Sequence, residues 1–86
     1  MKLGDNQKRC ELFEKLGSQG FNIATLISPL SNVSTYSKVG EGSVVFPFSS
    51  VEGMSIIGVG CIISKGAVAG HAAKVGDYCF VYEKQL

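Results

Sequence analysis

Every sixth residue from Ile27 to Val81 is a valine, an isoleucine or an alanine, without interruption. Because Ala, Val, Ile and Leu supply only 26 of the 86 residues, ten hits in one register have a chance probability on the order of one in ten thousand or less. A period of six is neither the 3.6 of an α-helix nor the 2 of a flat strand. It indicates a solenoid of short strands, each turning one aliphatic side chain inward before the chain turns a corner. This aliphatic ladder consists of Ile27, Val33, Val39, Val45, Val51, Ile57, Ile63, Ala69, Val75 and Val81.

A small residue stands four positions after every ladder residue except Val81, where Gln85 occupies the position, and glycines mark a longer interval. The small residues are Ser31, Ser37, Ser43, Ser49, Ser55, Cys61, Ala67, Ala73 and Cys79. Glycines recur at every third repeat unit, at Gly40, Gly58 and Gly76 and again at Gly42 and Gly60. Three units of six therefore form one triangular coil whose corners require a positive φ or a close backbone approach. Residues 27–86 are predicted to form a parallel β-helix of about three coils.

The position before each ladder residue carries a second pattern. Val44, Ile62 and Phe80 are apolar and follow one another at the spacing of a full coil, so they are expected to form one vertical stripe. If the ladder points inward, this stripe points outward, and an exposed apolar stripe on a small chain marks an interface. Self-association through the stripe is the expectation. The alternative is that the N-terminal helix of the same chain covers it.

Residues 1–26 lack the six-residue pattern. Asp5 or Asn6 can cap a helix that runs to about Leu16, and Gly17 and Gly20 offer C-terminal stops. The following residues 21–27 (FNIATLI) are predicted to form a strand. This helix–strand segment is too small to be a domain by itself and must pack on another element.

Composition restricts the class of protein. A chain of 86 residues has room for one domain with a small core. The net charge of +1 gives no indication of nucleic-acid binding. No apolar run approaches the roughly 18 residues of a membrane span, and the first residues lack the apolar segment of a secretory signal. A cytoplasmic protein that binds no nucleic acid and does not span a membrane is expected.

The three cysteines do not indicate a disulfide framework, since the count is odd. Cys61 and Cys79 both occupy the small position of the repeat, one coil apart, and are expected to stack as small buried residues. A disulfide requires Cβ atoms about 3.8 Å apart, closer than the roughly 4.8 Å between neighbouring parallel strands. Cys10 lies in the predicted helix without a candidate partner.

Several segments resemble one family. The units VGEGSV, IGVGCI, ISKGAV and VGDYCF resemble the motif of the hexapeptide-repeat acyltransferases: an aliphatic residue, often Gly, two variable residues, then a small residue. The stretch LGDNQKR…FEKLGSQGF…ATLISP resembles the junction between a Rossmann-like domain and the β-helix in the sugar and sialic-acid-type O/N-acetyltransferases. The resemblance implies an all-β, left-handed parallel β-helix over residues 27–86. It implies that residues 1–26 are a remnant of the N-terminal domain and that the chain is a truncated member.

The segment AVAGHAAKVGDYC resembles the family's active-site region. By this resemblance His71 is the general base that deprotonates a sugar amine or hydroxyl, which then attacks the thioester of acetyl-CoA. Imidazole suits this role because it changes protonation state near neutral pH. Ser64 stands where a supporting Asn is usual. The family implies a homotrimer that binds the sugar and acyl-CoA in grooves between subunits.

Other positions depart from the family pattern, so a second function stays open. Ala72 replaces the acidic residue that commonly follows the histidine, and Phe80 replaces a second histidine of the cofactor pocket. A non-catalytic trimeric β-helix, acting as a structural or binding module, is the alternative to acetyl transfer. The zinc carbonic anhydrases of the same fold require three histidine ligands. His71 is the one histidine of this chain, so no metal site is expected.

Overall fold

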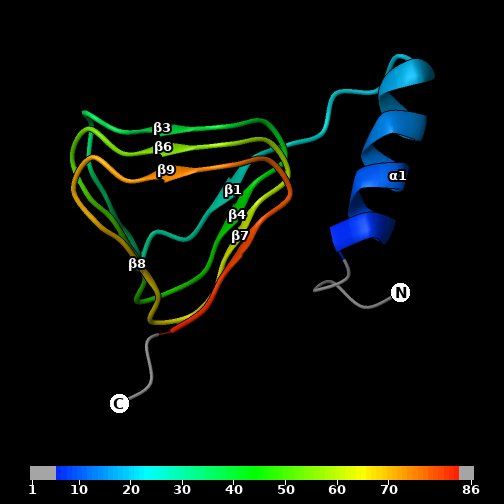
Figure 1. The fold of residues 1–86 in the computed structure, drawn as a ribbon. Coiled ribbons are helices and arrows are strands. Elements are labelled where there is room, and N and C mark those ends of the chain that lie inside the picture. The colour runs from blue at the N-terminus through cyan, green and yellow to red at the C-terminus, as the bar shows by residue number, and fades with distance from the viewer. Residues whose placement is uncertain (1–5, 84–86) are drawn as a thin grey trace.

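The protein is a triangular prism of stacked β-coils with one helix beside it. The structure, a computed structural model, describes residues 6–83. Ten two-residue strands form three parallel sheets, which are the three faces of the prism in Figure 1. Sheet A contains β1, β4, β7 and β10, sheet B contains β2, β5 and β8, and sheet C contains β3, β6 and β9. The predicted all-β, left-handed β-helix of about three coils is confirmed.

The elements follow the six-residue period. Their bounds are α1 Asn6–Ser18, β1 Leu26–Ile27, β2 Asn32–Val33, β3 Lys38–Val39, β4 Val44–Val45, β5 Ser50–Val51, β6 Ile56–Ile57, β7 Ile62–Ile63, β8 Val68–Ala69, β9 Lys74–Val75 and β10 Phe80–Val81. Each strand pairs with the equivalent strand of the next coil, as Val45 does with Ile63. We name each corner by the two sheets that it connects. The A–B corner comprises residues 28–31, 46–49 and 64–67, and the B–C corner comprises residues 34–37, 52–55 and 70–73. The C–A corner comprises residues 40–43, 58–61 and 76–79.

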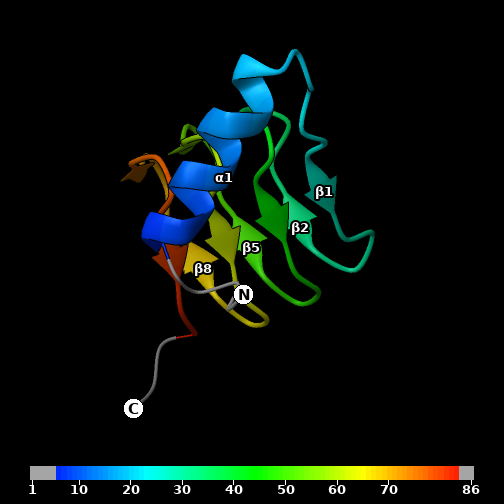
Figure 2. The ribbon, with the colours of Figure 1, turned by 90° about the vertical axis from the view of Figure 1, so that its right-hand side faces the viewer.

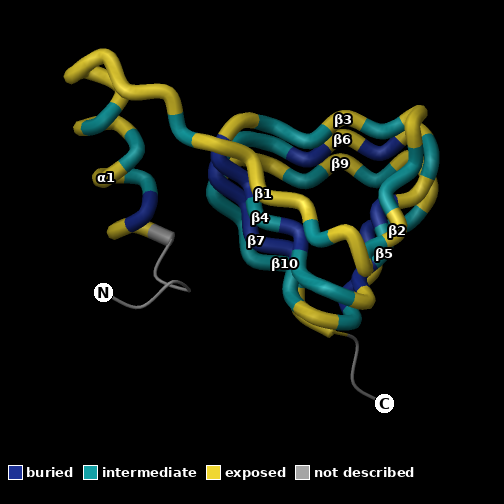
Figure 3. The backbone as a smooth tube through the Cα atoms, turned by 180° about the vertical axis from the view of Figure 1, so that it is seen from behind, coloured by how far each residue is buried: buried dark blue, intermediate teal, exposed yellow. Residues whose placement is uncertain are grey.

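The aliphatic ladder fills the interior of the prism. In the middle coils its residues are at most 3% exposed, from Val45 to Ala69. At the first coil nothing described stacks above the ladder, and Ile27 is 46% exposed. Figure 3 shows this change along the stack, from exposed residues at β1 to buried residues in the coils beneath it. The predicted inward direction of the ladder is therefore confirmed.

The small position of the repeat is explained by how each corner is closed. The Ser49 hydroxyl donates to the Phe46 carbonyl at 2.6 Å, and Ser31 and Ser37 make the equivalent bonds three residues back. A buried hydroxyl needs such a partner, and the backbone carbonyl of its own corner supplies it. Ser43 donates instead to the Gly58 carbonyl of the next coil, at 2.7 Å. Serine thus combines the small volume that the narrow interior requires with a hydrogen bond.

The recurring glycines serve the two purposes predicted for them. Gly42 and Gly60 adopt φ values of +72° and +66°, in the left-handed region that favours glycine. Gly40 instead lies against the backbone of the coil below it. A Cβ atom at Gly40 would overlap the Gly58 carbonyl oxygen and lie 2.8 Å from the Val59 nitrogen. The C–A corner is therefore closed by backbone-to-backbone packing.

Helix α1 packs on the C–A corner, as Figures 1 and 2 show. The Arg9 guanidinium is buried there and donates to the carbonyls of Gly60 at 3.2 Å and Tyr78 at 2.8 Å. Phe13 meets the Tyr78 ring edge to face, with ring centroids 5.7 Å apart. A buried charge is tolerated here because carbonyl oxygens solvate it. The helix is thus fixed to the prism by one cation and one aromatic pair.

The apolar stripe differs from the prediction. Val44, Ile62 and Phe80 do stack in register on sheet A. However, Ile62 is only 3% exposed, and Val44 and Phe80 are half-buried, so the expectation of an exposed stripe is wrong. Sheet A is the face beside which α1 lies (Figure 3). The arrangement favours the alternative in which the helix of the same chain shields this face.

The segment between the helix and the prism also differs. The predicted strand over residues 21–27 is wrong for residues 21–25, because only Leu26 and Ile27 have a partner strand, β4. Helix α1 runs to Ser18, so Gly17, one of the two predicted stops, lies within the helix. The other predicted stop, Gly20, adopts a φ of +84° just after the helix. The Phe21 amide donates to the Leu16 carbonyl and the Gly20 amide to the Gly17 carbonyl, which is a Schellman motif. Of the two predicted caps, Asp5 lies outside the described residues and Asn6 is already helical.

All three cysteines are free, as predicted. Cys61 is fully buried and Cys79 is half-buried. Burial raises the pKa of the Cys61 thiol. At Cys61 the small position therefore holds an unreactive thiol in the place of Ser or Ala. Within residues 6–83, no helix has the length and apolar character needed to cross a membrane.

Candidate active site at the B–C corner

His71 lies on the B–C corner, between β8 and β9. The corner closes through a hydrogen bond from the Ala73 amide to the Gly70 carbonyl at 3.0 Å. Ala72 adopts a φ of +59°, and its amide donates to the Gly53 carbonyl of the previous coil at 3.0 Å. This tight turn leaves the His71 side chain exposed to solvent. An imidazole in this position is accessible to a substrate that approaches the corner.

The coil above leaves space next to this imidazole. Gly53 stacks over His71, and a Cβ atom at Gly53 would lie 3.8 Å from His71 Nδ1 and 3.6 Å from Ser34 Oγ. Because Gly53 has no side chain, the strip between the Ser34 hydroxyl and the imidazole is open. Polar atoms from two coils therefore border one narrow gap on the corner.

A carboxylate also reaches His71 from the previous coil. Oε1 of Glu52 accepts a hydrogen bond from the His71 backbone amide at 3.1 Å. Among the hydrogen bonds of the described residues, this one joins a carboxylate to the histidine. The carboxylate comes from the previous coil, whereas the family motif places its acidic residue directly after the histidine. The site thus contains an imidazole, a hydroxyl and a carboxylate, each from a different position along the corner.

Exposed apolar side chains surround the site. Met54 is 62% exposed and is held at a φ of +63°, which is unusual for a residue with a long side chain. Tyr36, on the same corner in the first coil, is 78% exposed. Ile56 and Val68 point outward from the flanking sheets C and B and are about half exposed. We call Tyr36, Met54, Ile56 and Val68 the corner ridge, since they form an apolar border on both sides of His71.

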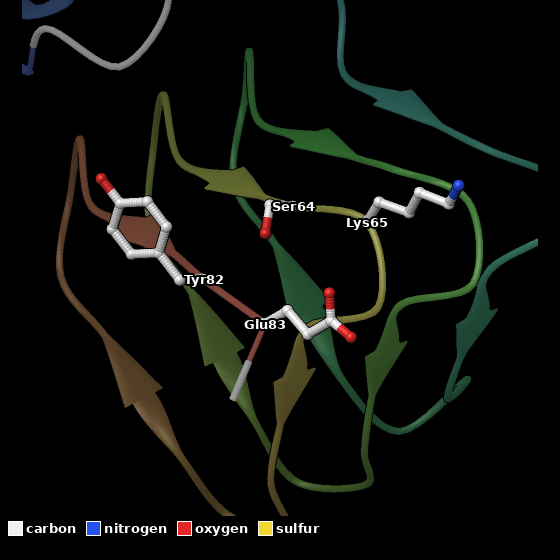
Figure 4. A pocket seen from close by; sticks show the side chains of 4 residues that line it. All are labelled: Ser64, Lys65, Tyr82 and Glu83. Atoms are coloured by element: carbon white, nitrogen blue, oxygen red, sulfur yellow. The ribbon is translucent and has the colours of Figure 1, made fainter. Parts of the chain in front are cut away.

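The structure places Ser64 at a different corner from His71. Ser64 belongs to the A–B corner, and β8 separates it from the B–C corner. Together with Lys65, Tyr82 and Glu83, it lines an open pocket (Figure 4). The two residues that the family motif brings together are thus on successive corners of one coil. The pocket is a groove beside Ser64 and not the surroundings of the histidine.

Aromatic and charged side chains border the Ser64 pocket. Tyr82 stacks on Phe80 with ring centroids 4.4 Å apart, and the Lys65 ammonium lies 5.9 Å from the Phe48 ring centroid. The Glu83 side chain lies over Gly66, which adopts a φ of +77°. Phe80 is the residue that replaces a histidine of the family's cofactor pocket. Here it supports the Tyr82 ring at the pocket's edge.

The C–A corner contains a tyrosine hydroxyl whose pKa is shifted by its surroundings. Burial, followed by the nearby Cys10 thiol and the Glu14 carboxylate, raises the pKa of the Tyr78 hydroxyl. Tyr78 is part of the packing of α1 on the C–A corner and contacts Phe13 there. Among residues 6–83, no group of three His, Cys, Asp or Glu side chains is placed to hold a metal ion.

Sequence reasoning found His71 but missed Glu52, Gly53 and Met54. Their roles become visible only when the chain is aligned in steps of one coil, which places Gly53 directly over His71 and Glu52 over Gly70. The one-coil spacing of the sequence therefore carries the signal that these residues meet. It does not specify the direction of the Glu52 side chain, which extends to the residue after the one on which Glu52 stacks.

Comparison with known proteins identifies similar solved structures, while no family profile matches the chain. The acetyltransferase domain of PglB from Neisseria gonorrhoeae FA1090 is 28% identical, with a TM-score of 0.87, and the match covers 90% of this chain. The same domain is also known in complex with acetyl coenzyme A. PerB from Caulobacter crescentus, in complex with CoA and GDP-perosamine, is 35% identical over 90% of this chain with a TM-score of 0.87.

These matches extend over a limited part of the longer proteins. This chain spans 38% of the PglB domain and 37% of PerB. A variant of the Caulobacter crescentus perosamine N-acetyltransferase in which a histidine is replaced by asparagine matches equally well, at 34% identity and a TM-score of 0.87. The similarity to these proteins, in fold and in sequence, thus extends over nearly all of this chain.

Proposed function

Because this chain is a member of the hexapeptide-repeat acyltransferase family, we propose that it is part of an acetyl-CoA-dependent sugar acetyltransferase. The acceptor in this proposal is an amine or hydroxyl of a nucleotide-linked sugar. The observation that carries it is the exposed His71 imidazole on a corner of a fold shared with proteins that bind CoA and GDP-perosamine. Gly53, which has no side chain, leaves the imidazole uncovered on the side of the coil above it.

His71 acts in this reaction as a general base. The imidazole takes a proton from the acceptor amine as the nitrogen attacks the thioester carbon of acetyl-CoA. The carbon–sulfur bond then breaks, and the proton passes to the departing thiolate. The products are the acetylated sugar and CoA. The reaction as proposed calls for no metal, since a thiolate is a sufficient leaving group for attack by a neutral amine.

We further propose that the chain forms a homotrimer through the corner ridge. The ridge gathers four exposed apolar side chains around one corner, and a contiguous exposed apolar patch marks an interaction surface. Packing them against a neighbouring subunit would bring its A–B corner, with Ser64 and its pocket, toward His71. This would reunite in one groove the two residues that a single chain keeps apart.

The acyltransferase proposal is tested with the ligands themselves. Isothermal titration of the chain with acetyl-CoA is expected to show saturable binding at or below millimolar concentration. Incubation with acetyl-CoA and GDP-perosamine is then expected to yield an acetylated sugar and free thiol, measured by mass spectrometry and thiol release. No binding at millimolar acetyl-CoA, together with no transfer, would reject the proposal for this chain.

Trimer formation through the ridge is tested by mass. Light scattering is expected to give about three times the 9.1 kDa of one chain. The substitution Met54→Lys places a charge in the interface and should shift the mass toward one chain. Phe21→Lys is the matched control, since Phe21 is 60% exposed in the segment after α1 and lies outside both the ridge and the A–B corner. A wild-type mass of one chain would contradict the proposal.

A binding or structural module without catalysis is the second candidate. It is favoured by one observation, that Ala72 offers no carboxylate next to the histidine in sequence. Such a module would bind acetyl-CoA or a sugar without turnover. The same two measurements separate the candidates, because binding without transfer identifies the module.

A further inference from the structure

We propose that Glu52 is a positioning residue that holds the His71 imidazole for general-base work. The inference rests on the proposed function, but its test does not depend on activity. Glu52 belongs to the coil before His71, and its carboxylate oxygen lies 3.1 Å from the His71 backbone nitrogen. The group therefore reaches the histidine across the stack of coils rather than along the chain.

The register of the prism shows that this reach is specific. β5 pairs with β8 such that Val51 faces Ala69, so Glu52 stacks over Gly70. The carboxylate nevertheless bonds to His71, one residue further on. Within residues 6–83, its other oxygen has no hydrogen-bond partner. One oxygen thus anchors the carboxylate at the histidine, and the second oxygen is free to accept from the ring.

Two other carboxylates of the prism serve as a comparison. Glu41 accepts from the Ile23 amide at 3.1 Å, and Asp77 accepts from the Val59 amide at 2.8 Å. Both reach back along the chain by one full coil, and neither partner has an ionisable side chain. They tie a neighbouring segment to the C–A corner. Glu52 reaches forward instead, to the one histidine of the chain.

The space around the ring permits the second contact. Gly53 leaves His71 Nδ1 uncovered on the side of the Glu52 coil, with 3.8 Å to the place where a Cβ would be. Apart from its chain neighbours, Gly70 has no atom within 4 Å of its Cβ position, so the turn is open at this point. Nδ1 is thus the ring nitrogen that faces the coil carrying Glu52.

The chemistry of a general base gives this contact a purpose. A neutral imidazole carries a hydrogen on one ring nitrogen and accepts a proton at the other. A hydrogen bond donated by the N–H determines which nitrogen carries the hydrogen and which one acts as the base. A carboxylate at Nδ1 favours the Nδ1–H tautomer, leaves Nε2 as the base and stabilises the imidazolium that forms. Ala72 cannot do this, since it lacks an acidic side chain. Glu52 supplies the missing group from another coil.

The test uses the fact that His71 is the only histidine. Labelling the imidazole with ¹⁵N gives one pair of ring signals, whose positions report the ratio of the two tautomers. Glu52→Gln keeps the side-chain length and the acceptor for the His71 amide but removes the charge. It is expected to lower the ratio of Nδ1–H to Nε2–H tautomer by about two- to fivefold, the range for an exposed charged pair. Glu52→Asp, whose shorter carboxylate cannot reach the ring from the same backbone, should act similarly.

Glu41→Gln is the matched control, because it removes an equally bonded carboxylate from another corner. It should leave the His71 signals unchanged. Unchanged signals in both Glu52 variants would overturn the inference and make Glu52 a corner tie like Glu41. If the tautomer ratio shifts but no acetyl transfer is found, the positioning contact stands and the acyltransferase proposal fails. In an active protein, Glu52→Gln should lower kcat by about the same two- to fivefold and leave KM for acetyl-CoA unchanged.

Discussion

Replacing Gly40 with alanine is expected to lower the free energy of unfolding by about 3 kcal/mol, the upper range for forcing extra atoms into a packed site. The new methyl group would overlap the Gly58 carbonyl oxygen and approach the Val59 nitrogen. Both are backbone atoms of the next coil, so no side-chain rotation can relieve the overlap. A chain of this size has a total stability of about 4 to 13 kcal/mol, so the loss is a large share of it. Urea unfolding followed by circular dichroism measures it.

Gly76 provides the matched control. It occupies the same position of the C–A corner two coils later, and only Cys79 Sγ comes within 4 Å of its Cβ position. Gly76→Ala is therefore expected to change the stability by less than about 0.5 kcal/mol. An equal loss at Gly40 and Gly76 would show that an intrinsic glycine preference, rather than contact between coils, determines these positions.

Replacing His71 with alanine is expected to lower kcat for acetyl transfer by about 10² to 10⁴-fold, the usual contribution of a general base. The imidazole is exposed, so its removal leaves no cavity, and stability should change by less than about 0.5 kcal/mol. Binding of acetyl-CoA should persist, because the base contacts the acceptor. Steady-state kinetics with acetyl-CoA and GDP-perosamine, together with titration calorimetry, measure both quantities.

Lys15→Ala is the control for this variant, since it removes an exposed polar side chain of α1 that lies away from the B–C corner. It should retain most of the activity. Full turnover by the His71→Ala variant would assign the chemistry to another group. Loss of acetyl-CoA binding and of turnover together would point instead to a structural role of the histidine.

The fold was predictable because its determinants are local and repeated. Each unit of six specifies one inward aliphatic residue, one small residue and one corner, and the recurrence of glycine at every third unit predicts which corners stack. The prediction failed where the repeat begins. Residues 21–25 have the β-branched and aromatic character of a strand, but a strand needs a partner, and only Leu26 and Ile27 have one. Strand propensity without an edge to pair with did not suffice.

The candidate site was predictable only in part. The motif around His71 identifies the histidine, and the tertiary structure adds what the coil above brings to it. Ser64 follows from the same motif, but its position on another corner means that the motif alone does not define a site within one chain. The exposed apolar surface was also misplaced, since Ile62 is buried whereas Met54 and Tyr36 are exposed.

The amino-acid sequence by itself determined the period, the inward ladder, the stacking interval and the identity of the one histidine. These are properties of residues close together in the chain or at a constant spacing. Only the tertiary structure decided that α1 packs on the C–A corner through Arg9 and Phe13. It also decided that Glu52 turns toward His71 rather than Gly70. The physical reason is the same in both cases. The backbone geometry of a neighbouring coil determines where a side chain points and which carbonyl or amide it reaches. No spacing in the sequence specifies that geometry.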